Sequence, residues 1–322
     1  MTTTLDSNPL SDRLAGGPLL LDGGLATELE NLGADLTGGL YSARCLLDSP
    51  DLILKVHRDF LEAGADCLIA ASYQASLEGF TARGLSAREA EQALVSSVAL
   101  ARRARRDFLE RRGEAPRPLV AASVGPYGAV LADGSEFTGS YGGVGARGLE
   151  RFHQDRLRLL AESGADLLAC ETLPSRVEIE VLADLLTARP AACWMSFSCR
   201  DGEHLADGTP LEAVAELLRD HPAIVALGVN CVPPSRVAPC LRSLRRAAPS
   251  VALLAYPNRG GSYDARTGQW IEETAATSAP SAFAAGAVEW LEAGAQILGG
   301  CCCTGPEDIR ALRAVLERRA SS

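Results

Sequence analysis

Two groups of cysteines stand out by residue type and spacing. Of the ten cysteines in the chain, one ends the run GVNC at residues 228–231, and three follow one another in GGCCC at residues 299–303. Thiolates bind Zn²⁺, attack carbon and form disulfides. No C-x2-C pair is present, so spacing alone leaves open a metal site and a redox site in which Cys231 pairs with Cys301 or Cys302.

The other six cysteines are typical of small core side chains. The N-terminal stretch 1–17 is polar and has no signal-peptide core, so we expect a cytoplasmic protein without a disulfide framework. The six cysteines expected in the core are Cys45, Cys67, Cys170, Cys193, Cys199 and Cys240.

Three similar segments indicate how the chain positions these thiols. Residues 60–71, 160–172 and 290–302 each predict a helix that ends at a left-handed glycine and continues into an apolar strand. Five further apolar runs predict strands, which makes eight in all. These runs are residues 18–21, 119–123, 192–197, 224–229 and 251–255.

Helical patterns alternate with the strands along the whole chain. They cover residues 50–63, 86–112, 151–163, 177–189, 211–220, 235–248, 280–291 and 306–319. Eight such units predict an α/β fold, a (β/α)8 TIM barrel, with an open doubly wound sheet as the alternative. We expect one domain over residues 18–322 after a flexible segment 1–17. In a barrel the strand ends converge at one mouth, so Cys231 and the cysteine run can meet there.

Other residues at the predicted strand ends suit an amino-acid ligand. Asp22 follows the first strand and Glu171 ends the fourth, where an unpaired carboxylate is costly and a cationic ligand relieves the cost. Gly23 and Gly24 offer backbone N–H groups to a carboxylate, or form a tight turn. The long loops 125–148 and 257–279, rich in glycine and aromatic residues, are predicted to be walls or lids of the pocket.

Composition excludes several classes of function. The net charge of -10 argues against a nucleic-acid partner or an anionic membrane surface, and no apolar run is long enough to span a bilayer. The arginines between residues 102 and 112 are interpreted as a solvated helix face. The four histidines lack metal-ligand spacing, which disfavours a histidine-based metal hydrolase.

Several motifs together resemble one family. Residues 21–29 (LDGGLATEL), 71–76 (ASYQAS), 131–136 (LADGSE), 170–174 (CETLP) and 256–258 (YPN), with the two cysteine runs, resemble in order the stretches of the homocysteine S-methyltransferases. These are barrel enzymes related to betaine-homocysteine methyltransferase. The resemblance spans nearly the whole chain and is greatest to the branch that uses S-methylmethionine or S-adenosylmethionine as methyl donor.

The resemblance implies one Zn²⁺ per chain, held by Cys231, Cys301 and Cys302. Cys303 stands where the family commonly has glycine, and is then a bystander or a spare thiol. A zinc-bound thiolate of L-homocysteine would take a methyl group from the sulfonium donor and give methionine. Asp22 and Glu171 resemble the carboxylates that hold the homocysteine ammonium.

Further residues are expected to contact the substrates. Aromatic faces such as Tyr73, Tyr127 or Tyr256 could hold the sulfonium by cation–π contact, and Asn230 lies beside the first ligand cysteine. Two alternatives remain at this point. One is a related methyltransferase with selenocysteine or another thiol as acceptor, and the other is a zinc-binding or thiol redox sensor without turnover. Oligomeric state has no signal in the sequence.

Overall fold

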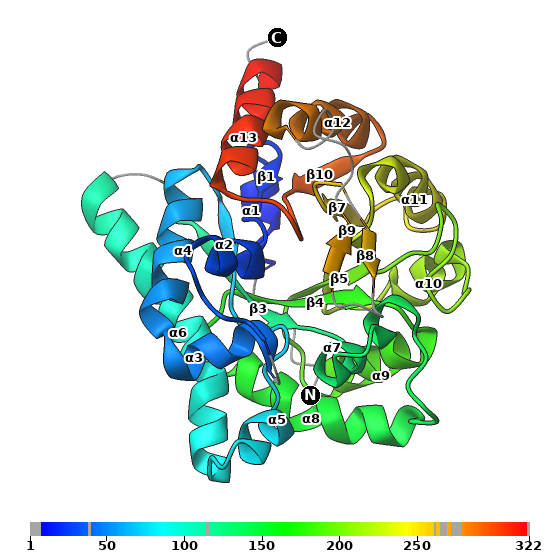
Figure 1. The fold of residues 1–322 in the computed structure, drawn as a ribbon. Coiled ribbons are helices and arrows are strands. Elements are labelled where there is room, and N and C mark those ends of the chain that lie inside the picture. The colour runs from blue at the N-terminus through cyan, green and yellow to red at the C-terminus, as the bar shows by residue number, and fades with distance from the viewer. Residues whose placement is uncertain are drawn as a thin grey trace.

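The protein is a barrel of parallel strands ringed by helices, as Figure 1 shows for a computed structural model. The structure describes residues 8–37, 40–113, 116–260, 262–264, 269–271 and 279–320. The strands run in the order β1-β10-β7-β6-β5-β4-β3-β2. A parallel bridge between Leu21 and Cys67 joins the two end strands. The predicted (β/α)8 barrel is therefore confirmed, and the open-sheet alternative is wrong.

The barrel strands are short, and all are parallel to their neighbours. Their bounds are β1 Leu19–Leu20, β2 Cys67–Ile69, β3 Leu119–Val124, β4 Leu167–Leu173, β5 Cys193–Phe197, β6 Ile224–Asn230, β7 Ala252–Tyr256 and β10 Ala295–Leu298. Side chains alternate between two buried layers. Leu19 and Leu21 point into the barrel interior with Trp194, whereas Leu20 packs outward against the helices. This arrangement explains why the strands are apolar on both faces.

The predicted helices are present, with additional short ones in the loops. The α-helices are α1 Ser11–Leu14, α2 Leu25–Asn31, α3 Cys45–Asp48, α4 Pro50–Glu62, α5 Leu77–Ala82, α6 Ala87–Arg112, α7 Tyr127–Leu131, α8 Ala146–Ala161, α9 Arg176–Ala188, α10 Leu211–Leu218, α11 Pro234–Ala247, α12 Pro280–Glu292 and α13 Pro306–Ala320. Two 3₁₀ helices are η1 Tyr41–Arg44 and η2 Ser135–Phe137. Within the described residues no helix is long and apolar enough to cross a membrane.

The three repeated helix-to-strand junctions have the predicted backbone. Gly64 after α4, Gly164 after α8 and Gly294 after α12 have φ angles of 103°, 84° and 103°. Glycine adopts this left-handed conformation without the steric cost that a Cβ atom brings. Each junction turns the chain from an outer helix directly into β2, β4 or β10.

The long loops contain regular structure that the sequence did not predict. The loop after β3 folds into α7 and η2. The loop after β7 includes an antiparallel hairpin of β8 Ser262–Asp264 and β9 Gln269–Ile271, and its residues 261, 265–268 and 272–278 lie outside the described part. Of the segment 1–17, the structure describes residues 8–17, in which Leu10 is fully buried against the barrel interior.

Two expectations about side-chain burial have different outcomes. All six cysteines predicted to be core residues are buried. The prediction of a solvated arginine face on α6 is wrong for Arg105, which is buried and forms an ion pair with Asp166. Arg105 also donates to the Pro118 carbonyl oxygen over 3.3 Å, so it ties α6 to the start of β3.

A Cβ atom at Gly228 on β6 would overlap the Leu254 carbonyl group of β7. We predict that Gly228→Ala lowers the free energy of unfolding by about 3 kcal/mol, because β6 must shift in a packed barrel. Gly16→Ala is the control, since its new Cβ would be 3.5 Å from the nearest atom. Urea unfolding of both variants checks this, and equal stabilities would contradict the close approach of the two strands.

Candidate metal centre and substrate pocket

The three predicted ligand cysteines meet at the carboxyl end of the barrel. Cys231 follows β6, and Cys301 and Cys302 follow β10, with only β7 between these strands. The three sulfurs lie within 4.8 Å of one another, and the Cys231 and Cys302 sulfurs are 3.6 Å apart. Tetrahedral coordination at about 2.3 Å per Zn–S bond separates two sulfurs by about 3.8 Å. The cluster therefore has the spacing of ligands to one ion.

Backbone contacts fix the direction of each thiol. Cys231 has a φ angle of 52°, a left-handed conformation that a side chain rarely adopts. The Cys301 N–H donates to the Pro257 carbonyl oxygen over 2.9 Å, and the Cys302 N–H donates to Asn258 Oδ1 over 3.1 Å. The sequence predicted no role for Asn258, although the YPN motif at residues 256–258 contains it. The loop after β7 thus holds the cysteine run in place.

The thiols also perturb one another. Hydrogen bonds from Cys231 and Cys302 lower the pKa of Cys301 well below that of an ordinary thiol. The hydrogen bond with Cys301, together with burial, raises the pKa of Cys231. Hydrogen bonds with Cys231 and Cys301, together with burial, raise the pKa of Cys302. Cys301 is therefore the thiol that loses its proton first in the absence of a metal.

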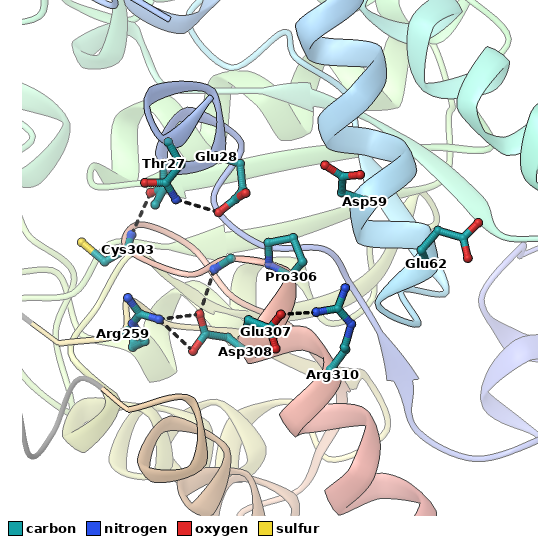
Figure 2. Close-up of a pocket in the computed structure, with 12 residues that line it drawn as sticks. Thr27, Glu28, Asp59, Glu62, Arg259, Cys303, Pro306, Glu307, Asp308 and Arg310 are labelled. Atoms are coloured by element: carbon teal, nitrogen blue, oxygen red, sulfur yellow. Dashed lines mark hydrogen bonds and ion pairs between the residues drawn. The ribbon is translucent and has the colours of Figure 1, made fainter. Parts of the chain in front are cut away.

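Cys303 does not belong to this group of sulfurs. Its N–H donates to Thr27 Oγ1 over 3.0 Å, and it borders a separate pocket of about 390 Å³ between α2 and the start of α13 (Figure 2). In that pocket Arg259 pairs with the fully buried Asp308 at 3.0 Å. The backbone N–H of Arg259 also donates to the Cys302 carbonyl oxygen over 3.1 Å, so Arg259 links the cysteine run to Asp308.

Two buried carboxyl groups lie at the same mouth. Asp22 is 4% exposed and accepts the Ile69 N–H at 2.8 Å, and Glu171 is 6% exposed. Burial raises the pKa of Asp22 well above its usual range, against the effect of the Ile69 N–H. Burial likewise raises the pKa of Glu171 to about 7. Among the described residues neither carboxyl has an ion-pair partner, which leaves both available to a cationic ligand.

Tyr256 supports Glu171 instead of offering an aromatic face. Its hydroxyl donates to Glu171 Oε2 over 3.0 Å, and the Ser123 hydroxyl donates to the other carboxylate oxygen. Trp194 Nε1 donates to the Tyr256 hydroxyl over 3.2 Å from inside the barrel. Because Tyr256 is only 1% exposed, its ring is closed to a ligand in this structure, unlike the cation–π role that the sequence suggested.

The other residues predicted for substrate contact differ in burial and in whether their polar groups already have partners. Asn230 is buried, and its Oδ1 accepts the Thr172 N–H over 2.7 Å. Its Nδ2 atom lies 4.0 Å from the Cys301 sulfur, so Asn230 helps to orient that thiol. Tyr73 is half-buried at the mouth. The Gly24 N–H already donates to the Thr304 carbonyl oxygen over 3.0 Å. Of the glycine pair, only the Gly23 N–H has no partner among the described residues.

Two buried charged groups, Arg156 on α8 and Glu178 on α9, anchor the surrounding loops, and no sequence motif indicated either. Arg156 donates to the carbonyl oxygens of Ser72, Tyr73, Ala75 and Gly125 at 2.6–2.8 Å. Glu178 on α9 accepts the Tyr127 N–H at 2.6 Å and contacts His153 Nε2 at 2.8 Å. Tyr127 packs edge-on to Phe152, with ring centroids 5.1 Å apart. Tyr127 is thus part of a loop anchor.

Comparison with known proteins agrees with this geometry. The family model for homocysteine S-methyltransferase matches residues 19–316, nearly the whole barrel. The chain belongs to this family. It is therefore a methyltransferase enzyme, which confirms the resemblance noted in the sequence and disfavours a sensor without turnover.

Individual members of the family are similar over most of their lengths. The homocysteine S-methyltransferase of Escherichia coli (strain K12) is 47% identical over 297 residues, which cover 92% of this chain and 94% of that protein. The selenocysteine Se-methyltransferase of Brassica oleracea var. italica is 42% identical over 317 residues, which cover 95% of this chain and 91% of that protein. The crystal structure of the Escherichia coli homocysteine methyltransferase MmuM in its metallated form has a TM-score of 0.85 at 45% identity, covering 96% of this chain and 100% of that one.

The raised pKa of Glu171 has a consequence for stability. Between the ordinary pKa of 4.5 and about 7, the folded protein retains a proton that the unfolded chain has released. Stability therefore falls as pH rises through this window, by up to about 3 kcal/mol. We predict that Glu171→Gln is more stable than the wild type at pH 8, and that the difference disappears below pH 4.5.

Urea unfolding at pH 4.5, 6 and 8 measures this effect. Glu150→Gln is the matched control, because Glu150 is exposed on α8 and its removal changes the net charge equally. A stability difference for Glu171→Gln that does not vary with pH would show that the folded-state carboxyl titrates normally.

Proposed function

We propose that this enzyme transfers a methyl group from a sulfonium donor, S-methylmethionine or S-adenosylmethionine, to the thiol of L-homocysteine, with one Zn²⁺ per chain. The observation that carries the proposal is the meeting at one mouth of three cysteine sulfurs and two buried carboxyl groups that have no ion-pair partner among the described residues. The thiols suit a soft metal ion with an open fourth position. The carboxyl groups suit the ammonium of an amino acid.

Cys231, Cys301 and Cys302 would hold the ion, and Asn258 and Asn230 would orient them through the contacts described above. Bound Zn²⁺ would lower the pKa of a substrate thiol at the fourth position, so that the nucleophilic thiolate is available at neutral pH. Asp22 and Glu171 would bind the homocysteine ammonium. The Gly23 N–H, which has no acceptor in the described part of the chain, would donate to its carboxylate.

The chemical step needs no general acid. The homocysteine sulfur, having lost its proton, forms a bond to the methyl carbon while the bond from that carbon to the donor sulfur breaks. The electron pair of the broken bond stays on the donor sulfur, which becomes a neutral thioether. Because the leaving group is already activated by its positive charge, the task of the protein is to align the two sulfurs and the carbon.

The proposed ligand set is testable by metal analysis. We predict about one zinc per chain in the purified, reduced protein, and loss of zinc and of methyl transfer together in Cys231→Ser, Cys301→Ser and Cys302→Ser. Cys303→Ser is the matched control, because this cysteine is next in sequence but outside the sulfur group, and it should retain both. Normal methyl transfer by zinc-free protein would overturn the proposed chemistry.

Selenocysteine is a second candidate acceptor, favoured by the similarity to a selenocysteine Se-methyltransferase. A selenol is more acidic than a thiol and binds to the same kind of soft metal site. We expect homocysteine to be preferred. A competition assay with equal concentrations of the two acceptors and either sulfonium donor measures the preference, and a product that is mainly Se-methylselenocysteine would assign the second activity instead.

A further inference from the structure

A serine inside the barrel has no role in the scheme above. Ser196 is on β5, between β4 and β6, and is fully buried. Its hydroxyl contacts two groups that do have roles, the hydroxyl of Tyr256 and the Oδ1 atom of Asn230, the latter over 2.8 Å. One buried hydroxyl therefore connects the support of Glu171 with the residue that precedes Cys231.

The number of hydrogens at Tyr256 decides which group donates. A tyrosine hydroxyl has one hydrogen to donate and can also accept. An ionised Glu171 can only accept, so the Tyr256 hydrogen then goes to Glu171 Oε2. Tyr256 accepts at its other two contacts, from Trp194 Nε1 over 3.2 Å and from Ser196 Oγ, since two hydroxyl oxygens in contact need a hydrogen between them. Around an ionised Glu171, donation runs from Ser196 through Tyr256 to the carboxylate.

An ionised Glu171 is the form that would bind an ammonium. Burial opposes this form, because it raises the pKa of Glu171 to about 7. Donors to the carboxylate act against the effect of burial. A hydroxyl that itself accepts a hydrogen bond donates more strongly, since the hydrogen bonds in a chain polarise one another. Ser196 thus strengthens the hydrogen bond from Tyr256 to the charged carboxylate.

Asn230 does not depend on the same hydroxyl. Its Oδ1 accepts the Thr172 N–H over 2.7 Å, and its Nδ2 donates to Thr172 Oγ1 over 2.7 Å. These two hydrogen bonds fix the direction of the amide even when the Ser196 hydrogen points toward Tyr256. Loss of the Ser196 hydroxyl should therefore spare the cysteine cluster.

We infer that Ser196 is a positioning residue for recognition of the acceptor ammonium, because its hydroxyl donates to Tyr256 and Tyr256 in turn holds the charged Glu171. The inference rests on the proposed function, in which Glu171 binds the ammonium of homocysteine. Ser196 is too deeply buried to touch the substrate, so its effect passes through two hydrogen bonds. It should influence acceptors that have an ammonium and no others.

Two acceptors that differ only in the amino group test this role. Homocysteine and 4-sulfanylbutanoate have the same thiol, carbon chain and carboxylate, and S-methylmethionine is the donor for both. We expect the wild type to prefer homocysteine, and Ser196→Ala to lower the ratio of the two kcat/KM values about fivefold. The kcat/KM for 4-sulfanylbutanoate and the zinc content should stay unchanged. Ser97→Ala is the matched control, because Ser97 is equally buried but lies on α6, where its hydroxyl donates to the Leu94 carbonyl oxygen over 2.6 Å.

Two further variants separate the hydrogen bond from packing. Ser196→Cys nearly keeps the volume of the side chain but has a weaker donor, so it should lower the ratio in the same direction and decides the question if Ser196→Ala does not fold. In Tyr256→Phe the chain of donation is cut, so adding Ser196→Ala should lower the ratio no further. A further fall in the double variant would show that Ser196 acts by another route and would overturn the inference.

The remaining outcomes separate the inference from the proposed function. Equal losses for both acceptors in Ser196→Ala, or an unchanged ratio, would overturn the inference and leave the proposed function standing. A wild type that does not distinguish the two acceptors would refute the ammonium role of Glu171, and the inference with it. A wild type that transfers no methyl group to homocysteine from either sulfonium donor would refute the proposed function itself.

Discussion

Closure of the barrel is the constraint on which the site depends. β6 and β10 are 65 residues or more apart in sequence, but each is hydrogen-bonded to β7, so the residues that follow them leave the barrel side by side. Gly228 lets β6 and β7 approach closely, and the left-handed backbone at Cys231 then turns its thiol toward Cys302. The packed barrel bears the strain of that conformation, which would not persist in a flexible loop.

The electrostatics of the mouth are incomplete in the protein alone. Two carboxylates, Asp22 and Glu171, are withdrawn from water near the thiols, and the buried Arg156 donates to backbone carbonyl oxygens. Buried carboxylates without ion pairs lower the free energy of unfolding. Natural proteins keep such destabilising groups where function requires them. These carboxylates and thiols are complementary to a positively charged ligand and to a divalent metal ion.

The sequence predicted much of this because its signals are local. Glycines after three helices and apolar runs defined the barrel, and the strand ends placed Cys231 and the cysteine run at one mouth. The family resemblance then singled out Cys231, Cys301 and Cys302 as the ligand set. Roles that depend on long-range packing were missed. Nothing local shows that the Tyr256 hydroxyl turns to Glu171, that the Gly24 N–H is used by Thr304, or that Arg105 is buried beside Asp166.

The charge changes in methyl transfer explain why one mouth can combine such groups. In the proposed reaction a thiolate and a sulfonium give two neutral thioethers, so opposite charges disappear as the reaction proceeds. A site shielded from water favours a transition state in which charge is dispersing, since little solvation is lost there. In this scheme the two buried carboxylates would recognise the charged amino-acid substrate.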